Sequence, residues 1–183
     1  YVAFDIETTG LYPQKGDRII EIGAVVLDHG SVVQEFHSLI NPGTPIHRAV
    51  QKVHGITNEM LASEPSPEDV MPLFHQFMGQ AYLVAHNAPF DMGFLRQELG
   101  RLDLSLVNKC YCTFKIAKKL VPGLPDYRLE TVYRHLFGDG FHGLKRHRAL
   151  EDARMTAKVW VELRRRAAPL VAHLDHGFSM KPS

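Results

Sequence analysis

Several protein classes are excluded by what this chain lacks. It has only two Cys in 183 residues, Cys110 and Cys112, and their C-x-C spacing forms neither a zinc knuckle nor a disulfide framework. We expect reduced, buried thiols in a reducing compartment, the cytoplasm. No apolar run approaches the ~18 residues that a membrane span needs, and no signal peptide is visible. A disulfide scaffold and a transmembrane protein are therefore excluded.

An excess of charge of one sign is also missing. With 21 basic and 20 acidic residues the formal net charge is +1, which argues against polyanion binding by the whole surface and leaves a local basic groove open. The content of 45% hydrophobic and 22% charged residues excludes a disordered or low-complexity chain. The length suits one domain that can bury about 70% of its extended-chain surface. Since the chain opens at Tyr1 rather than Met, a piece cut from a longer polypeptide is one interpretation.

Runs of β-branched and aromatic residues predict three strands at the start of the chain and a fourth near its middle. The predicted strands are residues 1–5, 18–27, 31–40 and 82–86. The second and third strands are joined by Asp28, His29 and Gly30, and this composition is typical of a hairpin turn. We therefore expect the second and third strands to pair antiparallel.

Helix signals dominate the remainder of the chain. Thr57 and Ser66 are predicted N-caps, and a Pro follows Ser66 at the first helical position. Further helices are predicted at residues 90–102, 113–121 and 128–137, and a long one from near Arg148. Strands followed by alternating strand and helix indicate an α/β layer structure around a mixed sheet. Residues 1–166 form the predicted domain, and residues 167–183 form a tail or linker.

The first candidate site lies in D-I-E-T-T-G, at the end of the first predicted strand. Because side chains alternate along a strand, Asp5 and Glu7 project to the same side while Ile6 points into the core. Two carboxylates on one face repel each other unless a cation lies between them, and hard oxygen ligands suit Mg²⁺ or Mn²⁺. A solvated strand end is an equally good interpretation of D-x-E alone.

Single charged residues elsewhere carry weaker signals. Asp91 ends the segment H-N-A-P-F-D at a predicted strand-to-helix junction, where the helix dipole alone favours an acidic residue. Glu21, on the second predicted strand, is expected to pair with a polar neighbour, and we assign it no role. Lys118 and Lys119 are interpreted as a solvated helix face. None of these positions identifies a site by itself.

His147 and Asp152 form a third candidate pair, in H-R-A-L-E-D. Residues five apart lie roughly 140° from each other around an ideal helix. Both can face one site only if His147 lies in the loop before the helix and Asp152 lies within the helix. An ordinary surface helix is the alternative interpretation.

Together, the segments D-x-E-T-T-G, H-N-A-x-F-D and H-x-A-x-x-D resemble the signatures of the DEDDh family of 3′–5′ exonucleases, the DnaQ-like group. The resemblance covers residues 1 to about 163, nearly the whole domain, and is strongest to the proofreading (epsilon) branch of bacterial replicative polymerases and its stand-alone relatives. It implies an α/β, ribonuclease H-like fold, a mixed five-stranded sheet flanked by helices on both faces. It also implies two divalent metal ions, Mg²⁺ or Mn²⁺, bridged by Asp5 and held further by Glu7, Asp91 and Asp152.

The resemblance implies a mechanism as well. Two cations held by these carboxylates could clamp the scissile phosphate, one to activate water and the other to stabilise the leaving 3′ oxygen. His147 deprotonates the attacking water, since imidazole titrates near neutral pH and suits a general base. The expected products are 5′-mononucleotides, released one at a time from the 3′ end of a single strand.

The family's substrate contacts fall on identifiable positions of this chain. The segment V-H-G-I-T is expected to meet the terminal nucleotide, with His54 and Ile56 at the last sugar and base. Thr8 is expected to hold the 3′-OH through its backbone, and Asn87 and Phe90 to line the same pocket. For Ile56 and Phe90, plain core packing is the alternative. Apolar contacts of this kind tolerate any base, because every base has a stacking face.

Three functional hypotheses follow from these residues. The first is a DNA 3′–5′ exonuclease that acts in proofreading or repair, either alone or with a DNA polymerase subunit or fused polymerase domain. The second is a 3′–5′ exoribonuclease, since RNA-trimming enzymes share the same carboxylates; tolerance of a terminal 2′-OH separates the two. The third is a non-catalytic nucleic-acid-binding module, which we disfavour because all four carboxylates and the His are intact.

Overall fold

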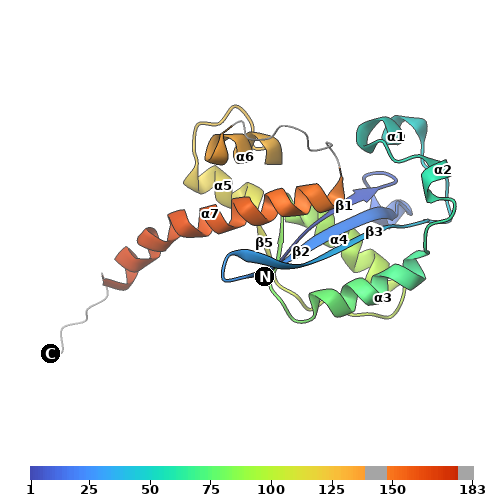
Figure 1. Cartoon of the computed structure of the whole chain (residues 1–183), viewed down its shortest axis with the longest axis horizontal. Coiled ribbons are helices and arrows are strands. Elements are labelled where there is room, and N and C mark those ends of the chain that lie inside the picture. Colours follow the sequence, from blue (N-terminus) through green and yellow to red (C-terminus); the bar gives the residue numbers. More distant parts are fainter. Residues whose placement is uncertain (139–147, 177–183) are drawn as a thin grey trace.

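The computed structural model describes residues 1–138 and 148–176 (Figure 1). Its centre is a five-stranded mixed sheet with the strand order β3-β2-β1-β4-β5. The strands are β1 (Val2–Thr8), β2 (Ile19–Asp28), β3 (Ser31–Leu39), β4 (Leu83–Ala85) and β5 (Cys110–Cys112). The pairs β1–β2 and β2–β3 are antiparallel, whereas β1–β4 and β4–β5 are parallel. The predicted mixed five-stranded sheet is therefore confirmed.

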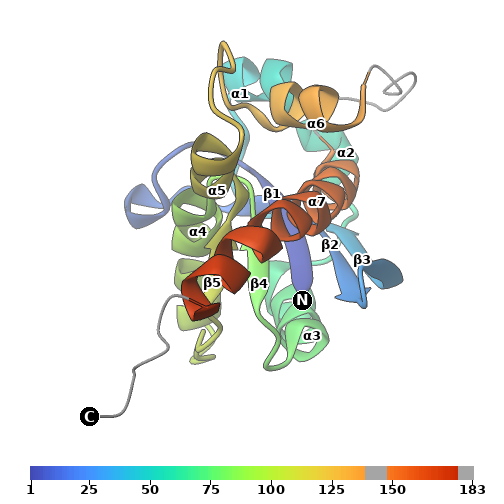
Figure 2. The same cartoon turned by 90° about the vertical axis from the view of Figure 1, so that its left-hand side faces the viewer.

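Helices cover both faces of the sheet, as predicted. They are η1 (Pro13–Lys15, a 3-10 turn), α1 (Arg48–His54), α2 (Asn58–Leu61), α3 (Pro67–Met78), α4 (Ala88–Gly100), α5 (Thr113–Leu120), α6 (Leu129–Phe137) and α7 (Ala149–His176). In Figures 1 and 2, α7 lies across one side of the sheet, and α3 and α4 lie on the other. Among the residues described, no helix combines the length and apolarity that a membrane crossing requires.

The alternation of side chains along β1 divides the core into two parts. Phe4 and Ile6 are buried against Phe74 of α3 and Phe94 of α4. Ala3, on the opposite face, is buried in a second cluster with Trp160 of α7. Asp5 and Glu7 belong to this second face. The sheet therefore presents its two central-strand carboxylates toward α7.

Two predicted helix starts are confirmed in detail. The Thr57 hydroxyl accepts a hydrogen bond from the backbone N–H of Met60 and caps α2. Ser66 caps α3 in a capping box, because its hydroxyl accepts from the backbone N–H of Asp69 and the Asp69 carboxylate accepts from the backbone N–H of Ser66. These caps fix the helices that follow the β2–β3 hairpin.

The two cysteines lie in β5, a three-residue strand whose position was not predicted from the sequence. Both thiols are free and half-buried rather than fully buried. Burial raises the pKa of the Cys110 thiol to about 12, so this thiol stays protonated at neutral pH. Both cysteines pack against the main hydrophobic cluster of the core.

The last helix reaches into the segment predicted as a tail or linker. Helix α7 continues past Pro169 to His176, whereas we placed the start of a tail at residue 167. A Pro removes one backbone N–H and disfavours the preceding helical turn, but it does not forbid a continuing helix. The division into a domain of residues 1–166 and a tail of residues 167–183 stays a prediction.

Candidate active site

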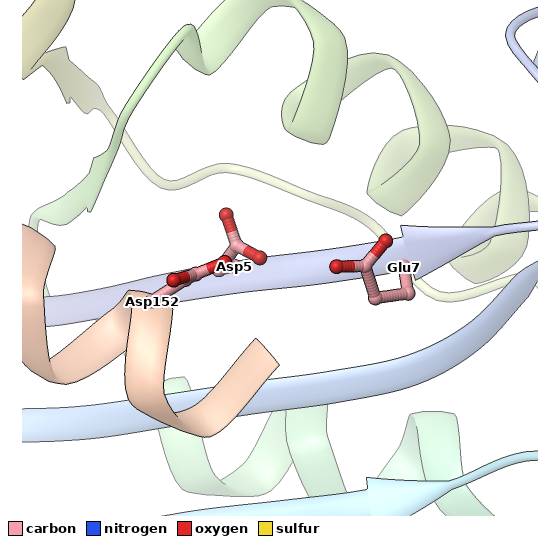
Figure 3. A group of neighbouring side chains, drawn as sticks. All are labelled: Asp5, Glu7 and Asp152. Atoms are coloured by element: carbon pink, nitrogen blue, oxygen red, sulfur yellow. The ribbon is translucent and has the colours of Figure 1, made fainter. Parts of the chain in front are cut away.

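Three carboxylates from the two ends of the chain meet at one point. A carboxylate oxygen from each of Asp5, Glu7 and Asp152 lies within 4.8 Å of the other two. Figure 3 shows Asp5 and Glu7 along β1, with Asp152 on the first turn of α7 beside them. The predicted strand alternation put the first two together. The docking of α7 on the sheet brings Asp152 to them across almost 150 residues of sequence.

The site is electrostatically strained without a cation. Burial, together with the negative charges of Asp152 and Glu21, raises the pKa of Glu7 to about 8, against a lowering effect of Arg148. Burial also raises the pKa of Asp152 to about 7, together with repulsion from Glu130, Glu21 and Glu151. Crowded carboxylates behave in this way when each penalises the charge on the next.

Asp5 and Asp91 show the same effect more strongly. Burial and then repulsion from Asp91 raise the pKa of Asp5 well above its ordinary value. Burial is also the main cause of the raised pKa of Asp91, which lies in the first turn of α4 and is only 3% exposed. Asp91 is thus electrostatically coupled to Asp5, although it is not one of the three residues within 4.8 Å of one another.

The carboxylates Asp5, Glu7 and Asp152 fit a divalent cation. Their oxygens converge, they are hard ligands, and their raised pKa values express a repulsion that a bound cation removes. Asp91, in the first turn of α4, is close enough to raise the pKa of Asp5 by charge repulsion, and its place among the metal ligands stays a prediction. Among the described residues, the converging set is made of carboxylates alone, which are hard ligands of the kind that divalent cations such as Mg²⁺ and Mn²⁺ take.

Two of the predicted substrate-contact residues are buried. The Nδ1 of His54 accepts the backbone N–H of Ile56 at 3.0 Å, and the His54 side chain is 6% exposed. Ile56 is fully buried with Ile20 and Leu61, so its side chain packs in the core as the alternative interpretation holds. Contact of His54 or Ile56 with a terminal nucleotide stays a prediction.

The other three predicted contacts are adjacent in sequence to predicted metal ligands or to the start of α4. Thr8 follows Glu7 directly, and its hydroxyl donates to the carbonyl of Gly10 at 2.6 Å, which holds the turn after β1. Asn87 is exposed at a positive φ of 71°, immediately before α4. Phe90 is half-buried and its ring lies 5.0 Å from that of Phe94, so it combines core packing with an exposed edge.

His147, the predicted general base, lies outside the described residues. Arg148, the next residue in the chain, is described, and its guanidinium Nε donates to Glu21 at 2.9 Å. Asp152 lies within α7, which is one of the two conditions for His147 and Asp152 to face the same site. The role of His147 stays a prediction.

Three features of the site region were not recognised from the sequence. Glu21 is fully buried and hydrogen-bonded to the start of α7. Glu98, 1% exposed on α4, accepts two hydrogen bonds from Arg18 and so ties the start of β2 to the helix that carries Asp91. For Glu21 the available signal was an acidic residue inside the apolar run I-I-E-I-G-A-V-V, since a buried carboxylate requires a partner; Glu98, in L-R-Q-E-L-G, carried no such signal.

The third missed feature is a cleft beside Asn87 with a volume of about 680 Å³. Its lining combines two cations and two aromatic rings with the strand-to-helix junction. The lining residues are His86, Asn87, Phe114, Lys118, Pro125, Asp126, Tyr127 and Arg128. Lys118 was predicted as a solvated helix face; it is exposed, and it also lies over the rings of Phe114 and Tyr127.

The fold and the site together define a class of protein. A mixed sheet that carries clustered carboxylates on its central strand, completed by one from a C-terminal helix, is a ribonuclease H-like nuclease. The exonuclease family model matches residues 2–160. The chain belongs to this family, which includes the DEDDh 3′–5′ exonucleases of the DnaQ-like group. The predicted family and enzyme class are therefore confirmed. Members of the family depend on divalent metal ions.

Individual relatives agree with this assignment. The chain is 34% identical over 167 residues to the DNA polymerase III subunit epsilon of Aquifex aeolicus, covering 89% of this chain and 79% of that protein. It is 43% identical over 162 residues to the PolC-type DNA polymerase III of Thermotoga maritima, covering 88% of this chain and 12% of the polymerase. The chain thus spans a small part of the PolC-type relatives.

A solved structure of an exonuclease X in complex with 5′ overhanging duplex DNA is similar along nearly the whole chain. The TM-score is 0.74 at 32% sequence identity, with 91% of this chain and 92% of that chain covered. The similarity confirms the predicted ribonuclease H-like fold.

Proposed function

We propose that this chain is the catalytic domain of a 3′–5′ exonuclease that releases 5′-mononucleotides from the 3′ end of single-stranded DNA, in proofreading or repair. The observation that carries the proposal is the convergence of Asp5, Glu7 and Asp152 within 4.8 Å on the α7 face of the sheet. Carboxylates from β1 and α7 do not need each other for folding, because their mutual repulsion opposes it.

Asp5, Glu7, Asp91 and Asp152 would hold two divalent ions, Mg²⁺ or Mn²⁺, whose chemistry at such a site is to activate water and to stabilise the leaving oxygen. The chain's own residues would orient the metal ions and remove a proton from the attacking water. We assign proton removal from the attacking water to His147, because an imidazole with a pKa near neutrality is an efficient general base.

The cleft beside Asn87 supports a polynucleotide substrate. Lys118 and Arg128 supply positive charge for phosphates, and the rings of Phe114 and Tyr127 supply flat apolar faces. Single-strand binding sites combine these two features. Asp126 lies on the same rim, but its carboxylate accepts the backbone N–H of Arg128 at 3.0 Å and is occupied by that bond. We assign to this cleft the nucleotides that precede the 3′ end.

DNA is the favoured substrate over RNA because similar proteins carry names from DNA metabolism. The exonuclease X structure holds DNA, and the epsilon subunit belongs to a DNA polymerase. By the same similarity we propose association with a DNA polymerase, as a separate subunit or as a fused domain with residues 1–166 as the exonuclease unit. The free thiols of Cys110 and Cys112 agree with a cytoplasmic location.

A timed digestion tests the proposal. Single strands labelled at the 3′ or the 5′ end, in matched DNA and RNA versions, are incubated with Mg²⁺, Mn²⁺ or EDTA. We expect a metal-dependent ladder that shortens from the 3′ end, faster on DNA, and a loss of about 10²–10⁴ in rate for His147→Ala. Faster digestion of RNA would establish the exoribonuclease alternative. A folded protein without cleavage under either metal would establish the binding-module alternative.

A further inference from the structure

The carboxylate of Glu21 on β2 is buried completely and carries three hydrogen bonds. It accepts from Nε of Arg148 at 2.9 Å, from the backbone N–H of Ala149 at 3.3 Å, and is bonded to Nε2 of His37 at 2.7 Å. Two of these partners are the residue before α7 and the first residue of α7. Glu21 thus attaches the start of α7 to the sheet.

A short chain of hydrogen bonds leads from Glu21 to Asp152. The Arg148 side chain is bound to Glu21, and the Arg148 carbonyl accepts the backbone N–H of Asp152 at 3.1 Å. One residue therefore separates the buried anchor from a carboxylate of the site. A displacement of Arg148 would be transmitted directly to the backbone of Asp152.

The strand register places this anchor opposite the site. Glu21 pairs with Glu7 across the β1–β2 ladder, and Gly23 pairs with Asp5. A Cβ at Gly23 would overlap with the backbone of Ala149 and Leu150, so α7 approaches β2 there as closely as only a glycine allows. Helix α7 therefore docks on β2 at the two positions that lie beside the metal-binding carboxylates of β1.

Keeping Glu21 at this position has an electrostatic cost. Its negative charge raises the pKa of Asp5, Glu7 and Asp152, all of which are already crowded. An apolar side chain would remove that repulsion and would fill the same buried space. A buried charge that opposes its neighbours needs a compensating role, and the attachment of Arg148 provides one.

Glu21 is not needed to hold α7 as a whole on the sheet, because other contacts do so. Farther along α7, Trp160 is packed with Ala3 and Val25 of the sheet. A second ion pair, Glu35 to Arg154, joins β3 to the same helix at 2.8 Å. The body of α7 is therefore held without Glu21. Apart from its bond to His37 of β3, the hydrogen bonds of Glu21 go to the residue before α7 and to the first residue of α7.

We propose that Glu21 and Arg148 form a positioning pair for the exonuclease reaction, holding the first turn of α7 in the place where Asp152 can share metal with Asp5 and Glu7. The inference rests on the proposed function, since it assigns a purpose to the geometry of that site. Misplacing a reacting group by about 1 Å can cost two orders of magnitude in rate, so the anchor has a measurable consequence.

Glu21→Gln tests the pair, with Glu35→Gln as the matched control, because both variants remove one carboxylate charge that bonds an Arg of the α7 region. For Glu21→Gln we expect kcat to fall by about 10- to 100-fold with KM changed less than threefold. We also expect faster amide hydrogen exchange in residues 149–152 and weaker Mn²⁺ binding by calorimetry without DNA. Glu35→Gln should match the wild type in all four measurements.

Arg148→Gln and the double variant complete the design, because Arg148 is partly exposed and its replacement is compatible with folding. If the two residues act as one unit, the double variant loses no more rate than the worse single variant, whereas independent losses would multiply. Multiplying losses, or wild-type amide exchange at 149–152 in Glu21→Gln, would overturn the positioning pair. Absence of cleavage by the wild type would instead overturn the proposed function, and the exchange measurement would still decide the anchor.

Discussion

A carboxylate in this site gives up its proton less readily than the same group in an unfolded chain. The pKa of Glu7 is raised to about 8 and that of Asp152 to about 7, both mainly by burial. In the metal-free protein, protonation of these groups therefore favours the folded state. Bound metal removes this preference, because it replaces the protons.

This linkage predicts an unusual dependence of stability on pH. Since the unfolded pKa values are about 4, the folded protein binds more protons between pH ~4 and ~8, and its free energy of unfolding falls as pH rises through that window. The expected loss is on the order of a few kcal/mol in EDTA, because one pKa unit corresponds to about 1.4 kcal/mol. His86 has the opposite effect: burial lowers its pKa, so its contribution to the free energy of unfolding rises with pH.

Urea unfolding in EDTA from pH 5.5 to 8.5 checks this prediction, with Asp152→Asn measured alongside. The difference between wild type and variant cancels the contribution of His86 and isolates that of Asp152 together with its repulsion of Asp5 and Glu7. We expect the variant to be the more stable of the two at pH 8 and to show the flatter profile. A wild type that is more stable in EDTA at pH 8 than at pH 5.5, with the same slope as the variant, would refute the linkage.

At the residue scale, the sequence was sufficient to predict which carboxylates of one strand lie together, but not which distant residues contact a given side chain. Strand alternation was sufficient to pair Asp5 with Glu7, because that rule is local. The partner of Glu21 lies 127 positions away at Arg148, and no local pattern reports such a contact. The burial of Ile56 was likewise one of two open alternatives, because an apolar residue suits a core and a base-binding surface equally.

At the scale of elements, the approach of α7 to β2 decides where Asp152 lies. Gly23→Ala places a methyl group against the backbone of this helix, which cannot move away as a flexible side chain could. We expect a destabilisation of about 1–3 kcal/mol, typical of overpacking, together with a fall in kcat because the first turn of α7 shifts from the carboxylates of β1.

Gly100→Ala is the matched control for this substitution. Gly100 ends α4, and a Cβ there has no neighbouring atom within 4 Å. The control is expected to stabilise the protein by about 0.5–1 kcal/mol through helix propensity and to leave cleavage unchanged. Thermal and urea unfolding together with kcat measure both variants. Equal stability and equal kcat of the two variants would show that the close approach at Gly23 is unimportant.

Elements with local signals were predicted well, and those set by packing were not. The hairpin of β2 and β3 and the caps of α2 and α3 have short sequence signatures, and the structure has all of them. Strand β5 is only three residues long and lies at the sheet edge, so it carries too few residues for a period-2 pattern. The extent of α7 past Pro169 was hidden because a Pro normally signals a helix end.

At the scale of the whole molecule, a chain with a net charge of only +1 must bind a polyanion locally. The cleft that Lys118 and Arg128 line is where we propose that such binding occurs. We expect the double variant Lys118→Ala with Arg128→Ala to raise KM for a DNA single strand with little change in kcat. The dependence of log(kcat/KM) on log salt concentration should become shallower by about 0.7 for each phosphate that the variant no longer neutralises.

Arg165→Ala is the control for net charge, because Arg165 is an exposed cation on α7 that pairs with Glu162. It should leave KM and the salt slope unchanged. A double variant in the cleft with wild-type KM and salt slope would remove the cleft from the substrate path, while leaving the carboxylate site untouched.

The central claim is that carboxylates from β1 and α7 form one metal site. The most direct test is a calorimetric titration with Mn²⁺ in the absence of DNA. It compares the wild type with Asp152→Asn and Glu35→Gln. We expect the wild type and Glu35→Gln to bind Mn²⁺ alike, and Asp152→Asn to bind at least about tenfold more weakly, since it loses one charged ligand. Equal Mn²⁺ affinity in all three proteins would contradict the claim.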